Sequence, residues 1–109
     1  MKYNSVLDLH THTIVSGHAY STLREMAKAA SDKGLELLGI TEHAPKMPGT
    51  CHQYYFDNLR VVPREMYGIQ LLLGSEVNIL DAQGTVDLAQ RTLERMDVVI
   101  ASLHMPCMK

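Results

Sequence analysis

One pattern occurs four times along this chain: a short apolar run ends in a histidine or a glutamate. The runs start near Val6, Leu37, Leu71 and Val98. They therefore recur roughly every 30 residues, the length of a strand, a crossover helix and the connecting loops. Strands joined by crossover helices lie parallel in one sheet. The repeat predicts an α/β fold with a parallel sheet.

Each run ends in side chains that commonly bind metal ions. They are His10 and His12 after the first run, His43 after the second, Glu76 after the third and His104 after the fourth. Alternate residues of a strand project from one face, so Asp8 shares a face with His10 and His12. Asp8 is a candidate ligand or a partner that orients an imidazole. Side chains at the carboxyl ends of neighbouring parallel strands meet, as at the catalytic face of a barrel.

The phase of the strands supports one shared site. In the second run, His43 lies on the same face as Thr41, and Ile40 lies on the other face. Glu76 and His104 likewise project from the face of their strands that carries few large apolar residues. Imidazole nitrogens and carboxylate oxygens are ligands of zinc and related divalent ions. We therefore expect these side chains to form a single metal site.

The segments between the runs contain helix and turn signals. A capping-box sequence at 22–25, apolar residues at helical spacing and then Gly34 predict a first helix. A second helix is predicted over 57–67, where Pro63 would kink the helix or begin a new one. A turn is predicted at 81–84 and an amphipathic helix over 86–96. Strands and helices are thus expected to alternate along the whole chain.

Composition restricts the partners that this chain can have. The 109 residues are 46% hydrophobic and no linker divides them, so 1–109 is interpreted as one domain. The net charge of −2 gives no electrostatic footprint for nucleic acid. No apolar stretch approaches the roughly 20 residues of a membrane span, and no N-terminal apolar region typical of a signal peptide appears, so secretion is not expected. We expect a cytoplasmic protein that binds neither membrane nor nucleic acid.

Five motifs, in this order, resemble those of the PHP (polymerase and histidinol phosphatase) family. Four of them are Asp8-Leu9-His10-Thr11-His12-Thr13, Thr41-Glu42-His43, Gly74-Ser75-Glu76-Val77-Asn78 and Ser102-Leu103-His104. The fifth, Ser16-Gly17-His18-Ala19-Tyr20-Ser21-Thr22, is similar to the small stand-alone bacterial phosphatase-like branch. The resemblance covers essentially the whole chain. It implies a distorted (β/α)7 TIM-like barrel, of which 1–109 would be the N-terminal part of a single PHP domain, roughly the first four βα units.

The resemblance also implies two or three divalent metal ions, usually zinc, with manganese or iron as alternatives. The implied ligands are His10, His12, His18, His43, Glu76 and His104, with Glu76 as a bridging carboxylate. The implied catalytic set is His10, His12, Glu76 and His104. His18 enters only through the resemblance. His52, Arg60 and Arg64 are candidates to contact a substrate phosphate, because the planar guanidinium of arginine suits that task.

Members of the family are longer than this chain, and their later motifs supply a further histidine and an Asp-x-His pair. This sequence would then form about half of the barrel. Half a barrel leaves strand edges unpaired. We therefore expect either a missing C-terminal half or a homo-oligomer that completes the sheet.

Three functions fit these motifs. The favoured function is metal-dependent hydrolysis of a small phosphorylated substrate, with metal-activated hydroxide attacking phosphorus. No side-chain nucleophile with a base partner is apparent outside the metal cluster. The alternatives are a polymerase-associated or nuclease-like PHP domain, and a catalytically incomplete metal-binding fragment. The mildly acidic charge favours the phosphatase over the nuclease.

Overall fold

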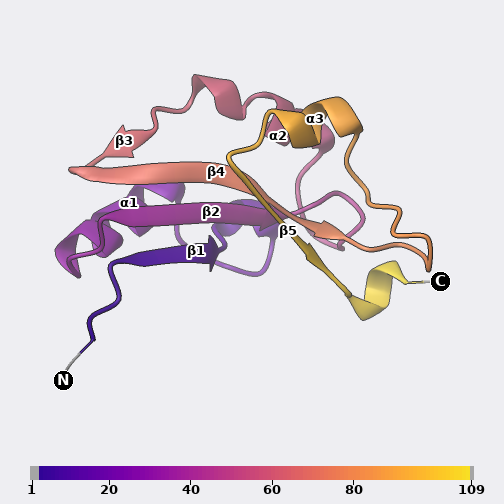
Figure 1. Cartoon of the computed structure of the whole chain (residues 1–109), viewed down its shortest axis with the longest axis horizontal. Coiled ribbons are helices and arrows are strands. Elements are labelled where there is room, and N and C mark those ends of the chain that lie inside the picture. Colours follow the sequence, from indigo (N-terminus) through magenta and orange to yellow (C-terminus); the bar gives the residue numbers. More distant parts are fainter. Residues whose placement is uncertain (1–2, 109) are drawn as a thin grey trace.

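The computed structural model describes residues 3–108 and alternates strands with helices (Figure 1). The elements, with η for a short 3-10 helix, are β1 (Leu7–Thr11), η1 (Ile14–Ser16), α1 (Leu23–Asp32), β2 (Leu37–His43), α2 (Gln53–Asp57), η2 (Leu59–Val61), β3 (Glu65–Met66), β4 (Ile69–Asn78), α3 (Gln90–Glu94), β5 (Val98–Ser102) and η3 (Met105–Cys107). Across these residues, no helix is long and apolar enough to cross a membrane.

Four parallel strands form the sheet in the spatial order β1, β2, β4 and β5. Figure 1 shows β1, β2 and β4 side by side and β5 crossing beside β4 at an angle, so that the sheet is curled. The short strand β3 pairs antiparallel with the start of β4, whereas β5 pairs with its end. The predicted α/β class with a parallel sheet is confirmed. The curl is consistent with part of a TIM-like barrel, and the count of seven βα units stays a prediction.

One face of the sheet packs against the helices. Leu38 and Ile40 of β2, and Leu71 and Leu73 of β4, are at most 2% exposed and share a core with Ala27 of α1. Burying an aliphatic side chain of this size stabilises a fold by about 1.5–3 kcal/mol. Because side chains alternate along a strand, the intervening positions project from the opposite face. That opposite face carries the polar site.

The first predicted helix is confirmed, and its ends follow the expected signals. The hydroxyl of Thr22 accepts a hydrogen bond from the backbone N–H of Glu25 at 3.2 Å. The Glu25 carboxylate accepts one from the backbone N–H of Thr22 at 2.9 Å, which completes the capping box. Just beyond α1, Gly34 has a φ of 84°, the left-handed conformation that commonly ends a helix.

The helix predicted over 57–67 is wrong. The helical segment α2 lies earlier and ends at Asp57, where the chain continues through η2 and Pro63 into β3. A proline disfavours helical backbone at the residue before it, and Val62 is indeed extended, with a φ of −83° and a ψ of 129°. The proline therefore ends the helical segment instead of kinking a longer one.

The helix predicted over 86–96 is shorter than expected, whereas the turn at 81–84 is confirmed. Val86 forms an antiparallel bridge with Ile79, so it belongs to the small hairpin that follows β4. The helix α3 starts only after this hairpin, and Leu93 packs from it against the core. The apolar periodicity of this segment thus combines one hairpin residue with one short helix.

Candidate metal centre

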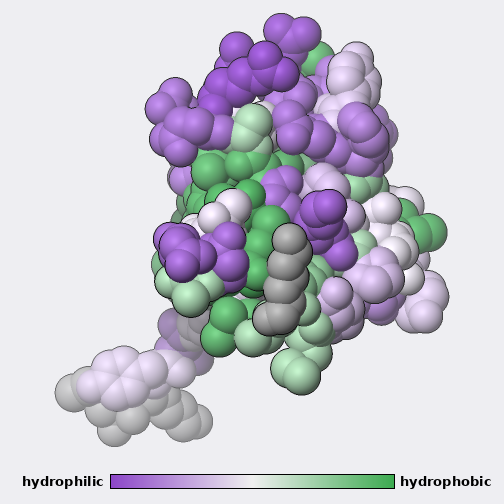
Figure 2. Space-filling model, turned by 90° about the vertical axis from the view of Figure 1, so that its right-hand side faces the viewer, coloured by the Kyte–Doolittle hydropathy of each residue, from purple (hydrophilic) through white to green (hydrophobic). Residues whose placement is uncertain are grey.

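The carboxylate of Glu76 is the centre of a cluster at the carboxyl ends of the parallel strands, the side that faces the viewer in Figure 2. His10 Nε2 and His12 Nε2 each lie 3.0 Å from Glu76 Oε1. His104 Nε2 lies 3.2 Å from Oε2, and His43 Nδ1 lies 3.4 Å from Oε1. The structure therefore brings together side chains from β1, β2, β4 and β5 or the residues directly after them.

His18 joins this cluster from the loop after η1. Its ring centroid lies 5.2 Å from that of His12 and 4.6 Å from that of His43. The preceding residue, Gly17, has a φ of 85°, and a Cβ atom there would lie 2.0 Å from the carbonyl oxygen of Gly49. The loop that carries His18 thus packs directly against the loop after β2. This close approach requires glycine at position 17.

Three overlapping groups in this cluster have ligand atoms within 4.8 Å of one another. They are His10, His12 and Glu76; His43, Glu76 and His104; and His12, His18 and His43. His43 Nδ1 is also fully buried and, among residues 3–108, has no hydrogen-bond partner. Leaving such an atom unsatisfied costs about 1–3 kcal/mol. Histidine and carboxylate donors of this kind fit zinc and similar divalent ions.

The protonation states of the cluster suit metal coordination. Burial lowers the pKa of His43 to about 4, and burial also lowers the pKa of His12. Burial alone would raise the pKa of Glu76, but hydrogen bonds from Ser102 and His10 and the nearby imidazoles outweigh it and lower that pKa to about 2. At neutral pH the buried imidazoles are therefore neutral and the carboxylate is ionised, which are the forms that bind metals.

Two carboxylates that the sequence analysis did not single out lie behind the cluster. Glu42 is 0% exposed and accepts a 2.7 Å hydrogen bond from the hydroxyl of Ser16. Asp87 accepts a 2.6 Å hydrogen bond from the side-chain amide of Asn78. The sequence does contain a clue to Glu42. Alternation along β2 places its carboxylate on the side of the sheet that faces the helices, next to the buried side chains of Leu38 and Ile40.

The carboxylate of Asp8 binds the backbone of His10. The Asp8 carboxylate accepts a hydrogen bond from the backbone N–H of His10 at 3.1 Å, and its side chain is exposed. The pairing between β1 and β2 shifts between Asp8 and Thr11, so strict alternation does not hold across this strand. The Asp8 carboxylate therefore holds an irregular part of the strand.

The residues expected to contact a substrate phosphate lie outside the Glu76 cluster. His52 caps α2, because its Nδ1 accepts a hydrogen bond from the backbone N–H of Tyr54 at 3.0 Å. Arg64 Nε lies 2.7 Å from Asp97 Oδ2, and Arg64 Nη1 donates to two main-chain carbonyls. The guanidinium of Arg64 is therefore bound to two carbonyls of its own loop and to the residue that precedes β5.

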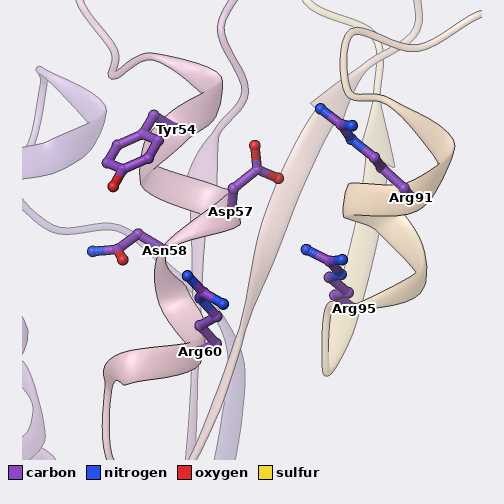
Figure 3. Close-up of a pocket in the computed structure, with 6 residues that line it drawn as sticks. All are labelled: Tyr54, Asp57, Asn58, Arg60, Arg91 and Arg95. Carbon is purple, nitrogen blue, oxygen red and sulfur yellow. The ribbon is translucent and has the colours of Figure 1, made fainter.

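Arg60 lines a separate hollow between α2 and α3, in the region that Figure 2 shows as hydrophilic. This hollow has a volume of about 210 Å³ and is lined by Tyr54, Asp57, Asn58, Arg60, Arg91 and Arg95. Figure 3 shows Arg91 and Arg95 across the hollow from Asp57. A 2.7 Å hydrogen bond from the hydroxyl of Thr92, together with these arginines, lowers the pKa of Asp57. The Asp57 carboxylate therefore offsets part of the positive charge there.

A curled parallel sheet with this cluster at its carboxyl edge defines an α/β domain with a candidate metal centre. The chain belongs to the PHP domain family, whose model matches residues 8–109. It is 56% identical over 107 residues to a probable phosphatase of Clostridium novyi (strain NT), covering 98% of this chain and 43% of that protein. A probable phosphatase of Caldanaerobacter subterraneus subsp. tengcongensis is 54% identical over 107 residues, covering 98% of this chain and 42% of the relative. The chain thus spans less than half of the length of these curated relatives.

Proposed function

We propose that this chain supplies part of the active site of a metal-dependent phosphoester hydrolase. The observation that carries the proposal is the convergence of four imidazoles on Glu76, at 3.0, 3.0, 3.2 and 3.4 Å. Similarity to proteins named probable phosphatase supports the same class of reaction. The proposed substrate is a small phosphorylated molecule.

The carboxylate of Glu76 is suited to bridge two ions. Its Oε1 faces His10 and His12, whereas its Oε2 faces His104, so the two oxygens serve different groups of imidazoles. The unpartnered Nδ1 of His43 adds a donor beside the second group. A third group consists of His12, His18 and His43. We therefore propose two or three divalent ions, zinc first, with manganese or iron as alternatives.

Clustered divalent ions, when bound, lower the pKa of a water molecule that becomes the nucleophile and stabilise the phosphoryl oxygens in the transition state. The residues of this chain prepare the site for that chemistry. Burial keeps His12 and His43 neutral, so no proton has to leave these rings before they coordinate an ion. Glu76 is the single carboxylate in the three ligand groups, so an occupied centre keeps excess positive charge that attracts a phosphate.

The cluster is open on the side of His10. The side chain of His10 is 49% exposed, whereas those of His12 and Glu76 are 17% and 6% exposed. We propose that a phosphate approaches from the His10 side while the fold shields Glu76 from solvent. Phosphate contacts by His52, Arg60 and Arg64 stay predictions.

Metal content tests the proposed centre. Protein equilibrated with zinc and then dialysed is expected to retain the ion in elemental analysis. The double variant His10→Ala/His12→Ala is expected to lose most of it. His52→Ala is the matched control, because this imidazole caps α2 and should leave the metal content near that of the unaltered protein. Equal loss in both variants would contradict the ligand assignment.

Turnover tests the reaction, with p-nitrophenyl phosphate and single-stranded DNA as competing substrates. Release of p-nitrophenol that a chelator abolishes would support the phosphatase. Cleavage of the DNA instead would identify a nuclease-like PHP domain. Metal binding without either reaction would identify a catalytically incomplete metal-binding fragment.

A further inference from the structure

Two hydrogen-bond relays, one centred on the buried Ser16 and one on the buried Asn78, connect carboxylates outside the cluster to imidazoles inside it. We propose that these carboxylates are positioning residues: each fixes, through one neutral side chain, which ring nitrogen of a histidine carries the proton. The relays are Glu42–Ser16–His12 and Asp87–Asn78–His104. The consequence for metal binding rests on the proposed metal centre, whereas the proton positions can be measured without any metal.

In the first relay, the hydroxyl of Ser16 has three partners and is fully buried. Its oxygen lies 2.7 Å from Glu42 Oε1, 2.9 Å from the backbone nitrogen of His43 and 3.0 Å from His12 Nδ1. The His43 N–H can only donate, and a carboxylate can only accept. The Ser16 proton therefore points to Glu42. The remaining lone pair of the Ser16 oxygen then requires a proton on His12 Nδ1.

The Glu42 carboxylate is held firmly enough to impose this direction. Its Oε1 also accepts from the backbone N–H of Thr13 at 2.8 Å, and its Oε2 accepts from the Thr13 hydroxyl. The Thr13 hydroxyl in turn accepts from the backbone N–H of Val15 at 3.2 Å. All three contacts to Glu42 thus come from donors, which suits an ionised carboxylate in a buried place. Thr13, which caps η1, and Ser16, within η1, supply these donors.

In the second relay, the amide of Asn78 is oriented by its acceptors. Its Nδ2 donates to Asp87 Oδ2 at 2.6 Å and faces the carbonyl oxygen of Ala44 at 3.4 Å. Because neither group can donate, this end of the amide must be the nitrogen. The Asn78 Oδ1 atom then lies 2.6 Å from His104 Nδ1 and accepts its proton. Asp87 itself is fixed by the backbone N–H groups of Asn78 and Lys46 at 2.8 and 2.9 Å.

Both relays place the ring proton on Nδ1, in His12 on one side of Glu76 and in His104 on the other. With Nδ1 protonated, the lone pair of each neutral ring lies on Nε2. His12 Nε2 then faces Glu76 Oε1 at 3.0 Å, and His104 Nε2 faces Oε2 at 3.2 Å. A lone pair opposite a carboxylate oxygen is unfavourable unless a cation lies between them. The relays therefore preset two rings to share a cation with the bridging carboxylate.

The experiment measures ring protonation in metal-free protein by ¹⁵N NMR of labelled histidines at neutral pH. In the unaltered protein, His12 and His104 are both expected to carry the proton on Nδ1. Ser16→Ala is expected to release His12 to a mixture of the two proton positions and to leave His104 unchanged. Asp87→Ala, which removes the acceptor for the Asn78 amide, is expected to change His104 and leave His12 unchanged. Each relay thus serves as the folding control for the other.

Glu42→Gln and Glu42→Ala separate the relay from a purely structural role. The amide of glutamine can keep an oxygen towards Ser16, so Glu42→Gln is expected to preserve the proton on His12 Nδ1, whereas Glu42→Ala is expected to lose it. Zinc affinity, measured by competition with a chromogenic chelator, is expected to fall about 10–100-fold for Ser16→Ala and for Asp87→Ala. Unchanged ring protonation in both variants would overturn the relays even if zinc binds. Failure of the unaltered protein to bind zinc would instead contradict the metal centre while the NMR result still decides the relays.

Discussion

His43 and Glu76 are register partners on β2 and β4, and their buried side chains meet with Nδ1 3.4 Å from Oε1. The pKa of His43 is about 4 and that of Glu76 is about 2, so at neutral pH neither group supplies a proton to the other. The buried Nδ1 of His43, which has no hydrogen-bond partner among residues 3–108, then faces a carboxylate oxygen, an arrangement that a bound cation would stabilise. Because the pKa values of both groups are lowered, these two proposed ligands should also make the stability of the metal-free fold depend on pH.

The metal-free protein is expected to lose stability as the pH falls. The ordinary pKa of histidine is 6.5 and that of folded His43 is about 4, so the unfolded chain takes up the proton first. The stabilisation is present above pH 6.5 and decreases as the pH falls towards 4, by at most about 1.4 kcal/mol per pH unit. The lowered pKa of Glu76 adds a second loss as the pH falls from 4.5 to about 2.

Urea denaturation at a series of pH values measures this free energy of unfolding. The variant His43→Gln is expected to make the profile between pH 6.5 and 4 shallower, because this imidazole no longer titrates there, whereas His12, whose pKa is also lowered by burial, still contributes. The lower part of the profile, which depends on Glu76, should remain. A pH-independent free energy across the upper window in the unaltered protein would contradict the environment described for His43.

Gly17→Ala is expected to displace His18. The added methyl would meet the Gly49 carbonyl oxygen at 2.0 Å, and the φ of 85° is itself unfavourable for alanine. Gly84→Ala is the matched control, since Gly84 has a φ of 81° with open space around it. We expect Gly17→Ala to lower both thermal stability and metal content, and Gly84→Ala to lower stability alone. Equal metal content in the two variants would show that His18 does not depend on this contact.

Arg64 is expected to contribute to stability and not to metal binding. Asp97 Oδ2 accepts from Arg64 Nε at 2.7 Å and from the backbone N–H of Leu73 at 2.9 Å, so the arginine holds a carboxylate that also binds β4. Arg64→Ala is expected to lower the free energy of unfolding by about 1–2 kcal/mol. Arg64→Lys should recover little of this loss, because an ammonium group cannot reproduce the planar set of bonds. Chemical denaturation and elemental analysis of the same samples check both statements.

The sequence predicted the parallel sheet because each parallel strand is an apolar run with one polar phase, although only β2 and β4 are buried. The edge at which His43 and Glu76 meet follows from the same alternation. Glu42 shows the limit of this reasoning. Its position in β2 predicts a side chain on the helix-facing side of the sheet, but it does not predict the hydrogen-bond donors of Thr13 and Ser16 that stabilise the buried carboxylate. The helix predicted over 57–67 failed for a local reason, since Pro63 ends the helical backbone.

The chain is expected to be a weaker catalyst than the longer probable phosphatase of Clostridium novyi, of which it covers 43%. The His10 side of the cluster is exposed to solvent, so an ion held there would be poorly shielded from water. We expect turnover of p-nitrophenyl phosphate per bound metal to be at least about tenfold lower for the chain. Steady-state kinetics at equal zinc occupancy provide the comparison. Equal turnover would mean that the residues of this chain suffice for the reaction.

The isolated chain is expected to self-associate. Among residues 3–108, β1 pairs only with β2, and β5 pairs only with β4, so each presents one unpaired strand edge. Apolar side chains are exposed on and beside these strands, with Leu7 at 45%, Val99 at 41% and Leu103 at 65%. Sedimentation velocity is expected to show dimers or larger species that Leu103→Lys weakens. Val61→Lys is the control, because Val61 is 66% exposed but lies on η2. A compact monomer at high micromolar concentration would instead indicate an open sheet that is stable on its own.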